Sequence, residues 1–270
     1  MGQSLAILIS TLTLGLLCNY GALSTFNFKN ISSFILGVAL ALIAEYAIRF
    51  FAFKSIQPEP AYSKVKFEHN YFWMVISPGY FFSAYFKRKI QYRDKNFNKR
   101  LQKKSKAIFI TSVNERNLIT SAIIFSIVFV AGVLKSNSEF QLFEYIIQVA
   151  LFFVLARTFS RSIEIIYAFT NDVINIAISN SSSLNKHDRI RLALNSYVEN
   201  IINFSAIYYL LKKEYLNVQG AFFSSIGRST ISNLDLKHED VLLSFVTYGQ
   251  VITTLTLVVL SLAIYVGRKM

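Results

Sequence analysis

Residues 241–266 read VLLSFVTYGQVITTLTLVVLSLAIYV, and this stretch contains no charged side chain. A helix needs about 20 consecutive, mostly apolar residues to cross the hydrocarbon core of a membrane. The whole chain of 270 residues has the same character, since 53% are hydrophobic and only 16% are charged. This composition excludes intrinsic disorder and a disulfide-stapled secreted domain, and the single cysteine, Cys18, cannot form an intrachain disulfide. The sequence therefore predicts an all-α polytopic membrane protein.

Six membrane spans are expected. They are residues 5–23, 33–53, 118–134, a segment that begins at about residue 143, 192–211 and 241–266. For the first span a signal peptide is the alternative, but no Lys or Arg precedes Lys29 to form its positive end. We divide the chain into a transmembrane hairpin (1–53), a basic region (54–117), the third and fourth spans with their linker (118–191), and a C-terminal module (192–270).

The basic charges predict the topology. Residues 54–116 hold 14 of the 28 Lys and Arg and only four acids, so this stretch carries +10 of the net charge of +13. Loops rich in Lys and Arg stay in the cytoplasm. We therefore expect a multipass protein of the cell (inner) membrane with both termini and the basic region in the cytoplasm.

The basic region contains an aromatic segment, residues 71–86 (YFWMVISPGYFFSAYF), with eight aromatics in 16 residues. We interpret it as an interfacial or re-entrant segment. Trp73 would lie at the headgroup boundary, with Lys87, Arg88 and Lys89 beside anionic lipid. The alternative is a small cytoplasmic core packed on the bundle. Beside a membrane, the basic region would meet anionic lipid before nucleic acid, so lipid is the favoured partner. A cytoplasmic protein is a further candidate partner.

Five charged residues fall within or beside the predicted spans, where an ionisable group predicts a functional role. Glu45 and Arg49 are four residues apart and form a self-neutralising pair on one helical face. Arg157 and Arg161 share a face as well, and they fit an ion-paired or snorkelling anchor better than a voltage sensor. Glu199 would pair with Arg157 or Arg161, and a proton relay is the alternative.

No catalytic constellation is visible in the sequence. The three histidines, His69, His187 and His238, are far apart, and no HExxH, GxSxG, P-loop or CxxC spacing occurs. We therefore expect no enzymatic activity, no cofactor and no metal site.

The C-terminal module combines two spans with a short apolar segment, residues 219–230 (QGAFFSSIGRST). This segment is too short to cross a membrane. A half-helix that dips into the membrane must be buried in protein or line water. The order of helix, re-entrant half-helix, loop and helix is the plan of a pore module.

Residues 196–268 resemble the two-helix pore domain of the tetrameric potassium-channel superfamily, especially its bacterial members. Residues 196–211 (SYVENIINFSAIYYLL) are similar to the outer helix of that family. Residues 221–235 (AFFSSIGRSTISNLD) lie where the family has a pore helix that runs into T-x-G-Y-G-D. The matching positions are Thr230 and Ile231 at the start and Asp235 at the end, with Ser232, Asn233 and Leu234 in place of G-Y-G. The resemblance implies a homotetramer with residues 230–235 around its axis.

The departure from the family pattern argues against potassium selectivity. A potassium filter consists of backbone carbonyl rings, whose geometry glycine reaches more cheaply than other residues. Leu234 is a poor residue for a left-handed position. Arg228, where the family is usually uncharged, would repel cations unless Asp235 or Glu239 pairs with it.

The last span carries a polar stripe. Ser244, Thr247, Thr254 and Ser261 recur at helical spacing, with Gln250 beside them. Such a stripe lines an inner cavity or mediates dry helix packing. We expect a channel-like protein with a gated or poorly selective pore. The alternative is a non-conducting scaffold or sensor, or a membrane effector of the toxin or phage-defence type that acts through its basic region.

Overall fold

The computed structural model describes residues 28–56, 72–93, 99–136, 141–174, 182–212, 217–232 and 241–267. Within these ranges all the regular structure is helical, which confirms the predicted class. The helices are α2 (Phe28–Lys54), α3 (Phe72–Ile76), α4 (Pro78–Arg93), α5 (Lys99–Ser136), α6 (Gln141–Ile174), α8 (Lys186–Lys212), α9 (Val218–Ser229) and α10 (Val241–Gly267). The first predicted span, residues 5–23, lies outside the described residues.

In the described part of the chain, four helices are long and apolar enough to cross a membrane. The candidate spans are Ile31–Lys54, Arg100–Ser136, Leu142–Asp172 and Leu242–Val259, in α2, α5, α6 and α10. By helix length and composition the chain is therefore a multipass membrane protein. These four candidate spans contain or overlap the second, third, fourth and sixth predicted spans.

The fifth predicted span, residues 192–211, lies in α8 and does not belong to this apolar set. The lower apolar content of α8 fits its position, because this helix packs against α5, α6, α9 and α10. Its polar side chains face protein rather than lipid, so the helix tolerates a less apolar sequence. The buried polar and charged residues of α8 are Arg189, Ser196, Glu199, Asn200, Asn203 and Ser205.

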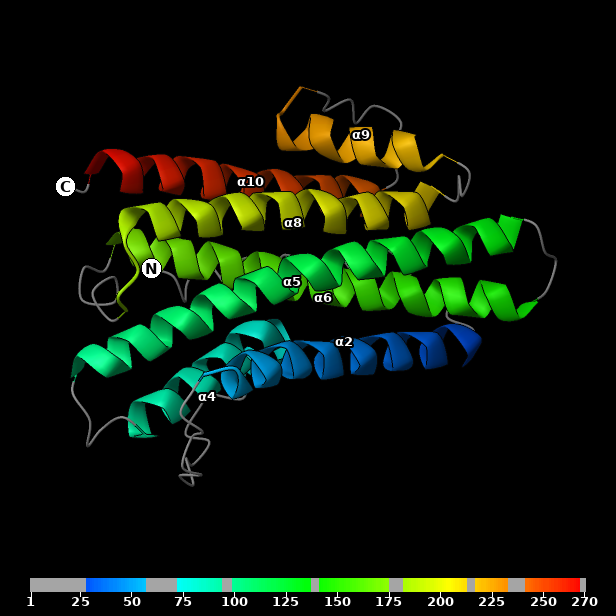
Figure 1. The fold of residues 1–270 in the computed structure, drawn as a ribbon. Coiled ribbons are helices and arrows are strands. Elements are labelled where there is room, and N and C mark those ends of the chain that lie inside the picture. Colours follow the sequence, from blue (N-terminus) through cyan, green and yellow to red (C-terminus); the bar gives the residue numbers. More distant parts are fainter. Residues whose placement is uncertain are drawn as a thin grey trace.

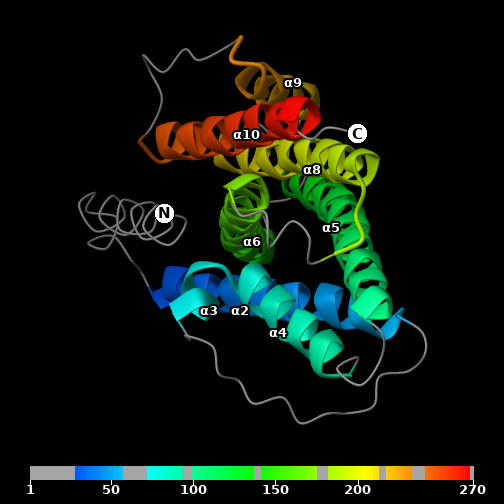
Figure 2. The ribbon, with the colours of Figure 1, turned by 90° about the vertical axis from the view of Figure 1, so that its left-hand side faces the viewer.

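The long helices lie side by side (Figure 1). Seen from the end, α8 and α10 lie on one side of the bundle, α2 and α4 lie on the other, and α6 lies between them (Figure 2). The approach of α2 to α6 is close at Gly37, where an added Cβ would be 2.8 Å from the Cβ of Phe152. Helix α6 therefore contacts both halves of the bundle, as does α5, which packs against α8 as well as α2 and α4.

The aromatic segment packs on the bundle, the arrangement of the alternative interpretation, and its position relative to a membrane surface stays a prediction. Phe86 and Ile90 of α4 are buried in a cluster with Phe53 of α2 and Phe109 of α5. Phe82, Phe86 and Ile90 recur every four residues and therefore lie on one face of α4. This buried face explains why the segment forms a helix against α2 and α5.

Helix α9 leaves the end of α8 and runs back along α8 and α10, ending about half-way along both (Figure 1). Its 12 residues span about 18 Å, which is too short to cross. The side chain of Asn217 caps its first turn by accepting a hydrogen bond from the Gly220 N–H at 2.8 Å.

The C-terminal end of α9 is a Schellman motif. The Ser232 N–H donates to the Gly227 carbonyl at 2.9 Å, and the Ile231 N–H donates to the Arg228 carbonyl at 3.2 Å. Ile231 has a φ of 59°, the left-handed conformation that usually falls to glycine. Thr230 and Ile231, which match the start of a filter, thus form a helix-capping turn. Asn233, Leu234 and Asp235 lie outside the described residues.

Candidate functional site

Six charged side chains meet in the middle of the bundle, and we call this group the ion network. All six are buried. With three acids and three arginines, the network has no net charge. It consists of Glu45 and Arg49 of α2, Arg157, Arg161 and Glu164 of α6, and Glu199 of α8. The structure thus unites all five of the intramembrane charges that the sequence singled out.

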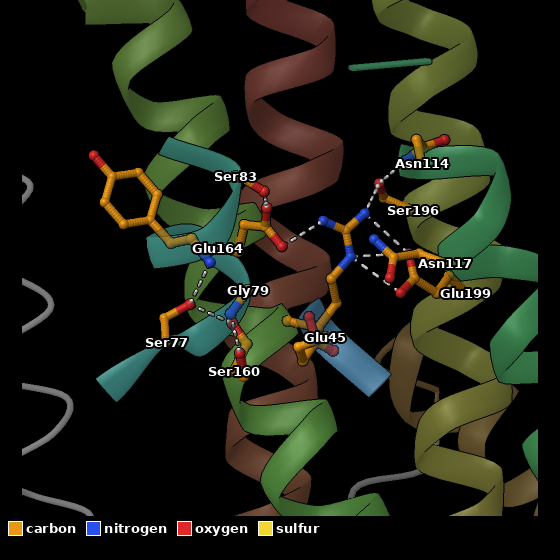
Figure 3. Close-up of polar contacts among 12 residues, drawn as sticks. Glu45, Ser77, Gly79, Ser83, Asn114, Asn117, Ser160, Glu164, Ser196 and Glu199 are labelled. Carbon is orange, nitrogen blue, oxygen red and sulfur yellow. Dashed lines mark hydrogen bonds and ion pairs between the residues drawn. The ribbon is translucent and has the colours of Figure 1, made fainter. Parts of the chain in front are cut away.

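The α2 side of the network is centred on Arg49. This arginine forms the expected ion pair with Glu45, one helical turn earlier. Its Nη2 also donates to Oε2 of Glu164 at 2.6 Å, and its Nε donates to Oγ of Ser83 at 3.2 Å. Ser83 in turn donates to Oε1 of Glu164 at 2.7 Å (Figure 3). Helices α2, α4 and α6 are therefore joined by charge-assisted hydrogen bonds.

The α8 side of the network is centred on Arg161. Its Nε and Nη2 donate to Oε1 and Oε2 of Glu199, both at 3.0 Å, in a bidentate pair. Its Nη1 donates to Oε2 of Glu164 at 3.0 Å. Arg161 is one of the two partners predicted for Glu199. Glu164 accepts from both Arg49 and Arg161, so it links the two sides of the network.

Arg157 extends the network to α5. Its Nη1 donates to Oγ of Ser121 at 2.9 Å and to Oδ1 of Asn203 at 3.3 Å. Its Nη2 donates to the carbonyl and to Oδ1 of Asn117, both at 3.3 Å. Its Nε lies 3.5 Å from Oε1 of Glu45. The five N–H groups of a guanidinium suit this role, because they reach partners on several helices at once.

The backbone at Gly79 touches the ion network directly. A Cβ at this position would be 2.6 Å from Nη2 of Arg49, 2.8 Å from Oε2 of Glu45 and 2.9 Å from Oε2 of Glu164. The Gly79 N–H also donates to Oγ of Ser160 at 3.1 Å (Figure 3). The structure shows that the glycine lets the start of α4 approach buried charges.

The network is arranged as a structural anchor. Each of the network's three carboxylates lies beside at least one arginine. The network therefore has no net charge on which a membrane potential could act. Burying such charges is costly, and removing one partner of a buried pair is strongly destabilising because the other is left uncompensated. The network thus holds α2, α4, α6 and α8 in one arrangement.

A second polar group, which we call the α9 cluster, joins α8, α9 and α10. Gln250 of α10 donates from Nε2 to the Ser225 carbonyl at 2.9 Å and to Oγ of Ser229 at 2.7 Å. Its Oε1 accepts from the hydroxyl of Tyr208 at 2.6 Å. The guanidinium of Arg228 lies over the Tyr208 ring, 4.3 Å from its centroid. The charged partners proposed for Arg228 lie outside the described residues.

The polar stripe of α10 faces this cluster and α8. Thr247, Gln250 and Thr254 are buried within the chain, and Oγ1 of Thr254 accepts from Nδ2 of Asn200 at 3.1 Å. The stripe therefore mediates helix packing, the second of the two interpretations, at these three positions. Ser244 is half-buried, and the side chain of Ser261 lies outside the described part of the chain.

The predicted lipid-interface residues have separate environments. Trp73 is half-buried, and its ring lies 4.8 Å from that of Tyr80. Lys89 lies over the Tyr85 ring, with Nζ 4.7 Å from the centroid, and Arg88 is half-buried. Lys87 instead lines a cavity between α4, α5, α6 and α8.

By helix length and composition, the described part of the chain is that of an all-helical multipass membrane protein. Comparisons with protein-family models, with curated proteins and with solved structures found no match. The resemblance to potassium-channel pore domains therefore rests on the residue pattern alone and remains a prediction.

Proposed function

We propose that this chain is a channel-like membrane protein that assembles as a homo-oligomer, with a tetramer favoured, around α8, α9 and α10. Its pore is gated or poorly selective. The observation that carries this proposal is the exposure of the turn after α9, residues 230–232, at a depth where lipid would otherwise surround it.

The depth follows from the contacts of α9. Oγ of Ser225 donates to the Ile201 carbonyl at 2.8 Å. Ile201 lies 11 residues before Lys212, the end of α8, or about 16 Å along the helix axis. We place Lys212 at the edge of the hydrocarbon core, which is about 30 Å thick. On that placement, α9 ends near the middle of the core. Non-helical backbone at that depth must be buried in protein or line water. Other copies of the chain around an axis would supply that shelter.

Disulfide cross-linking tests the assembly. Ile231→Cys in a Cys18→Ser background should form cross-linked copies under mild oxidation, because the turn lies near the axis. Ile35→Cys is the matched control, since Ile35 is exposed on α2, on the opposite side of the bundle (Figure 2). Monomers only, for both variants, would contradict assembly around α9.

Conduction is tested in planar bilayers with purified protein. Wild type should give single-channel events with little preference for potassium over sodium. Arg228→Ala should raise cation conductance if its guanidinium lies at the constriction, while Lys212→Ala, at the exposed end of α8, should not. Silence under voltage, lipid and pH challenge would favour the non-conducting scaffold, sensor or effector.

The proposed orientation has the basic region and both termini in the cytoplasm. In support, the end of α2, the start of α5, the end of α6 and the start of α8 all lie at one end of the bundle (Figure 1). Lys95→Cys should label only after permeabilisation, whereas Lys135→Cys should label on intact cells. The reverse pattern would invert the topology.

A further inference from the structure

The cavity between α4, α5, α6 and α8 has a volume of about 320 Å³. It lies toward the end of the bundle where α6 ends and α8 begins, since Asp172, Ser182 and Arg189 line it. Four basic and two acidic side chains line it. They are Lys87 of α4, Lys106 of α5, Arg161, Glu164 and Asp172 of α6, and Arg189 of α8.

The acids of this cavity are already paired. Glu164 accepts from Arg161 within the ion network, and Asp172 forms an ion pair with Arg189. In the described part of the chain, no ion pair or hydrogen bond joins Lys87 or Lys106 to a carboxylate. Among the described residues, the cavity therefore presents two lysine amino groups that have no close ion pair with a carboxylate.

The environment of Lys87 disfavours its charge when the cavity holds no anion. Burial lowers the pKa of Lys87, Glu164 opposes that shift, and Lys106 and Arg161 reinforce it. An anion between the two lysines would restore the charged form.

We propose that this cavity is a binding site for a phosphate group, held between Lys87 and Lys106. The phosphate would belong to an anionic phospholipid headgroup or to a soluble phosphorylated compound. The proposal does not depend on the proposed pore, because the two lysines that would hold the phosphate belong to α4 and α5.

Other lining groups fit such a ligand. Burial and the neighbouring Tyr167 raise the pKa of Tyr80, so its hydroxyl stays protonated beside an anion. One wall of the cavity includes Ile110, Val113 and Ile165, which would accommodate the less polar part of an ester. A phosphate monoester thus meets cations, neutral hydroxyls and apolar surface in one cavity.

The test uses full-length protein in nanodiscs of phosphatidylcholine, with the melting temperature as readout. Phosphatidic acid is titrated in one arm, and inorganic phosphate is added to pure phosphatidylcholine nanodiscs in the other. Stabilisation by phosphatidic acid alone identifies a lipid headgroup. Stabilisation by inorganic phosphate identifies a soluble ligand. No shift in either arm overturns the proposal.

Three variants separate the cavity from general surface charge. Lys87→Gln and Lys106→Gln should each weaken the apparent affinity for the stabilising probe about fivefold, the effect of removing one favourable charge near the membrane surface. Lys89→Gln is the matched control, because it removes the same charge from the same helix outside the cavity, and it should leave the affinity unchanged. Equal weakening in all three variants would reduce the effect to surface attraction and overturn the site. If one of the two cavity variants does not fold, the apparent affinity of the other variant for the probe still tests the site.

Discussion

The ion network and the α9 cluster bury polar groups in contrasting ways. The network balances three arginines against three carboxylates and is enclosed within one chain. The α9 cluster relies on neutral hydrogen bonds from Gln250 and on Arg228 over an aromatic ring, and it ends in an exposed turn. The contrast teaches that the ion network buries its charges within a single copy, whereas the α9 cluster ends in a turn that the single copy leaves exposed.

The largest effect is expected from the residue that links both sides of the ion network. Glu164→Ala should lower the free energy of unfolding by about 3–5 kcal/mol, because it leaves Arg49 and Arg161 short of a carboxylate. Reversible unfolding in mixed micelles measures this change. The control is Glu144→Ala, at an exposed position in the first turn of the same helix. Equal effects of the two substitutions would mean that the network does not stabilise the fold.

A second change breaks the network sterically. Gly79→Ala should destabilise the fold by about 2–3 kcal/mol, because the new methyl group would press on Arg49, Glu45 and Glu164. Gly249→Ala is the matched control. Its Cβ would meet only Cε1 of Phe159 at 3.8 Å, so helix propensity should make that variant neutral or slightly more stable. Thermal melting of both variants decides the point, and an unaffected Gly79→Ala protein would refute the close approach.

A substitution in the α9 cluster should lower the free energy of unfolding less than a substitution in the ion network. Gln250→Leu leaves Tyr208 and Ser229 without their partner and should cost about 1–2 kcal/mol. Because the loss is local, hydrogen exchange should speed up in α9 while α6 remains protected. Gln219→Leu, at an exposed position of α9, serves as the control. Uniform exchange along the chain would show that α9 is not a separate unit.

The smallest change concerns the turn at the end of α9. Ile231→Gly should raise the stability of the isolated chain by about 1 kcal/mol, because glycine adopts the left-handed conformation without a Cβ penalty. Ile226→Gly, inside α9, should instead lower it by a similar amount. If Ile231 contacts other copies, the same substitution should weaken the oligomer in cross-linking or native mass spectrometry. A less stable Ile231→Gly monomer would contradict this account of the turn.

Hydropathy and local spacing were sufficient to predict the helical class and part of the ion network. Glu45 and Arg49 are one turn apart, so their pairing could be read from a single helix. For Glu199 the prediction offered Arg157 or Arg161 as partner, and Arg161 forms the pair. In contrast, Gly79 and Ser83 reach the network only through the packing of α4 against α2 and α6, which no local pattern encodes.

For the aromatic segment, the packing of α4 on the bundle was the alternative interpretation rather than the first one. Its aromatic content matched a membrane interface, but the recurrence of Phe82, Phe86 and Ile90 is a helical stripe that could have predicted packing. The cavity around Lys87 was beyond reach, because its walls come from four helices that are far apart in sequence.

The distribution of charges among the helices of the ion network bears on membrane insertion. Helix α6 brings Arg157 and Arg161 against one acid of its own, Glu164, while Glu199 follows 38 residues after Arg161. A charged residue at the centre of a helix costs about 2.5–3.5 kcal/mol during insertion. While the chain is being made, α6 therefore emerges with an arginine whose main partner does not yet exist. We therefore expect stable integration of α6 to require α8.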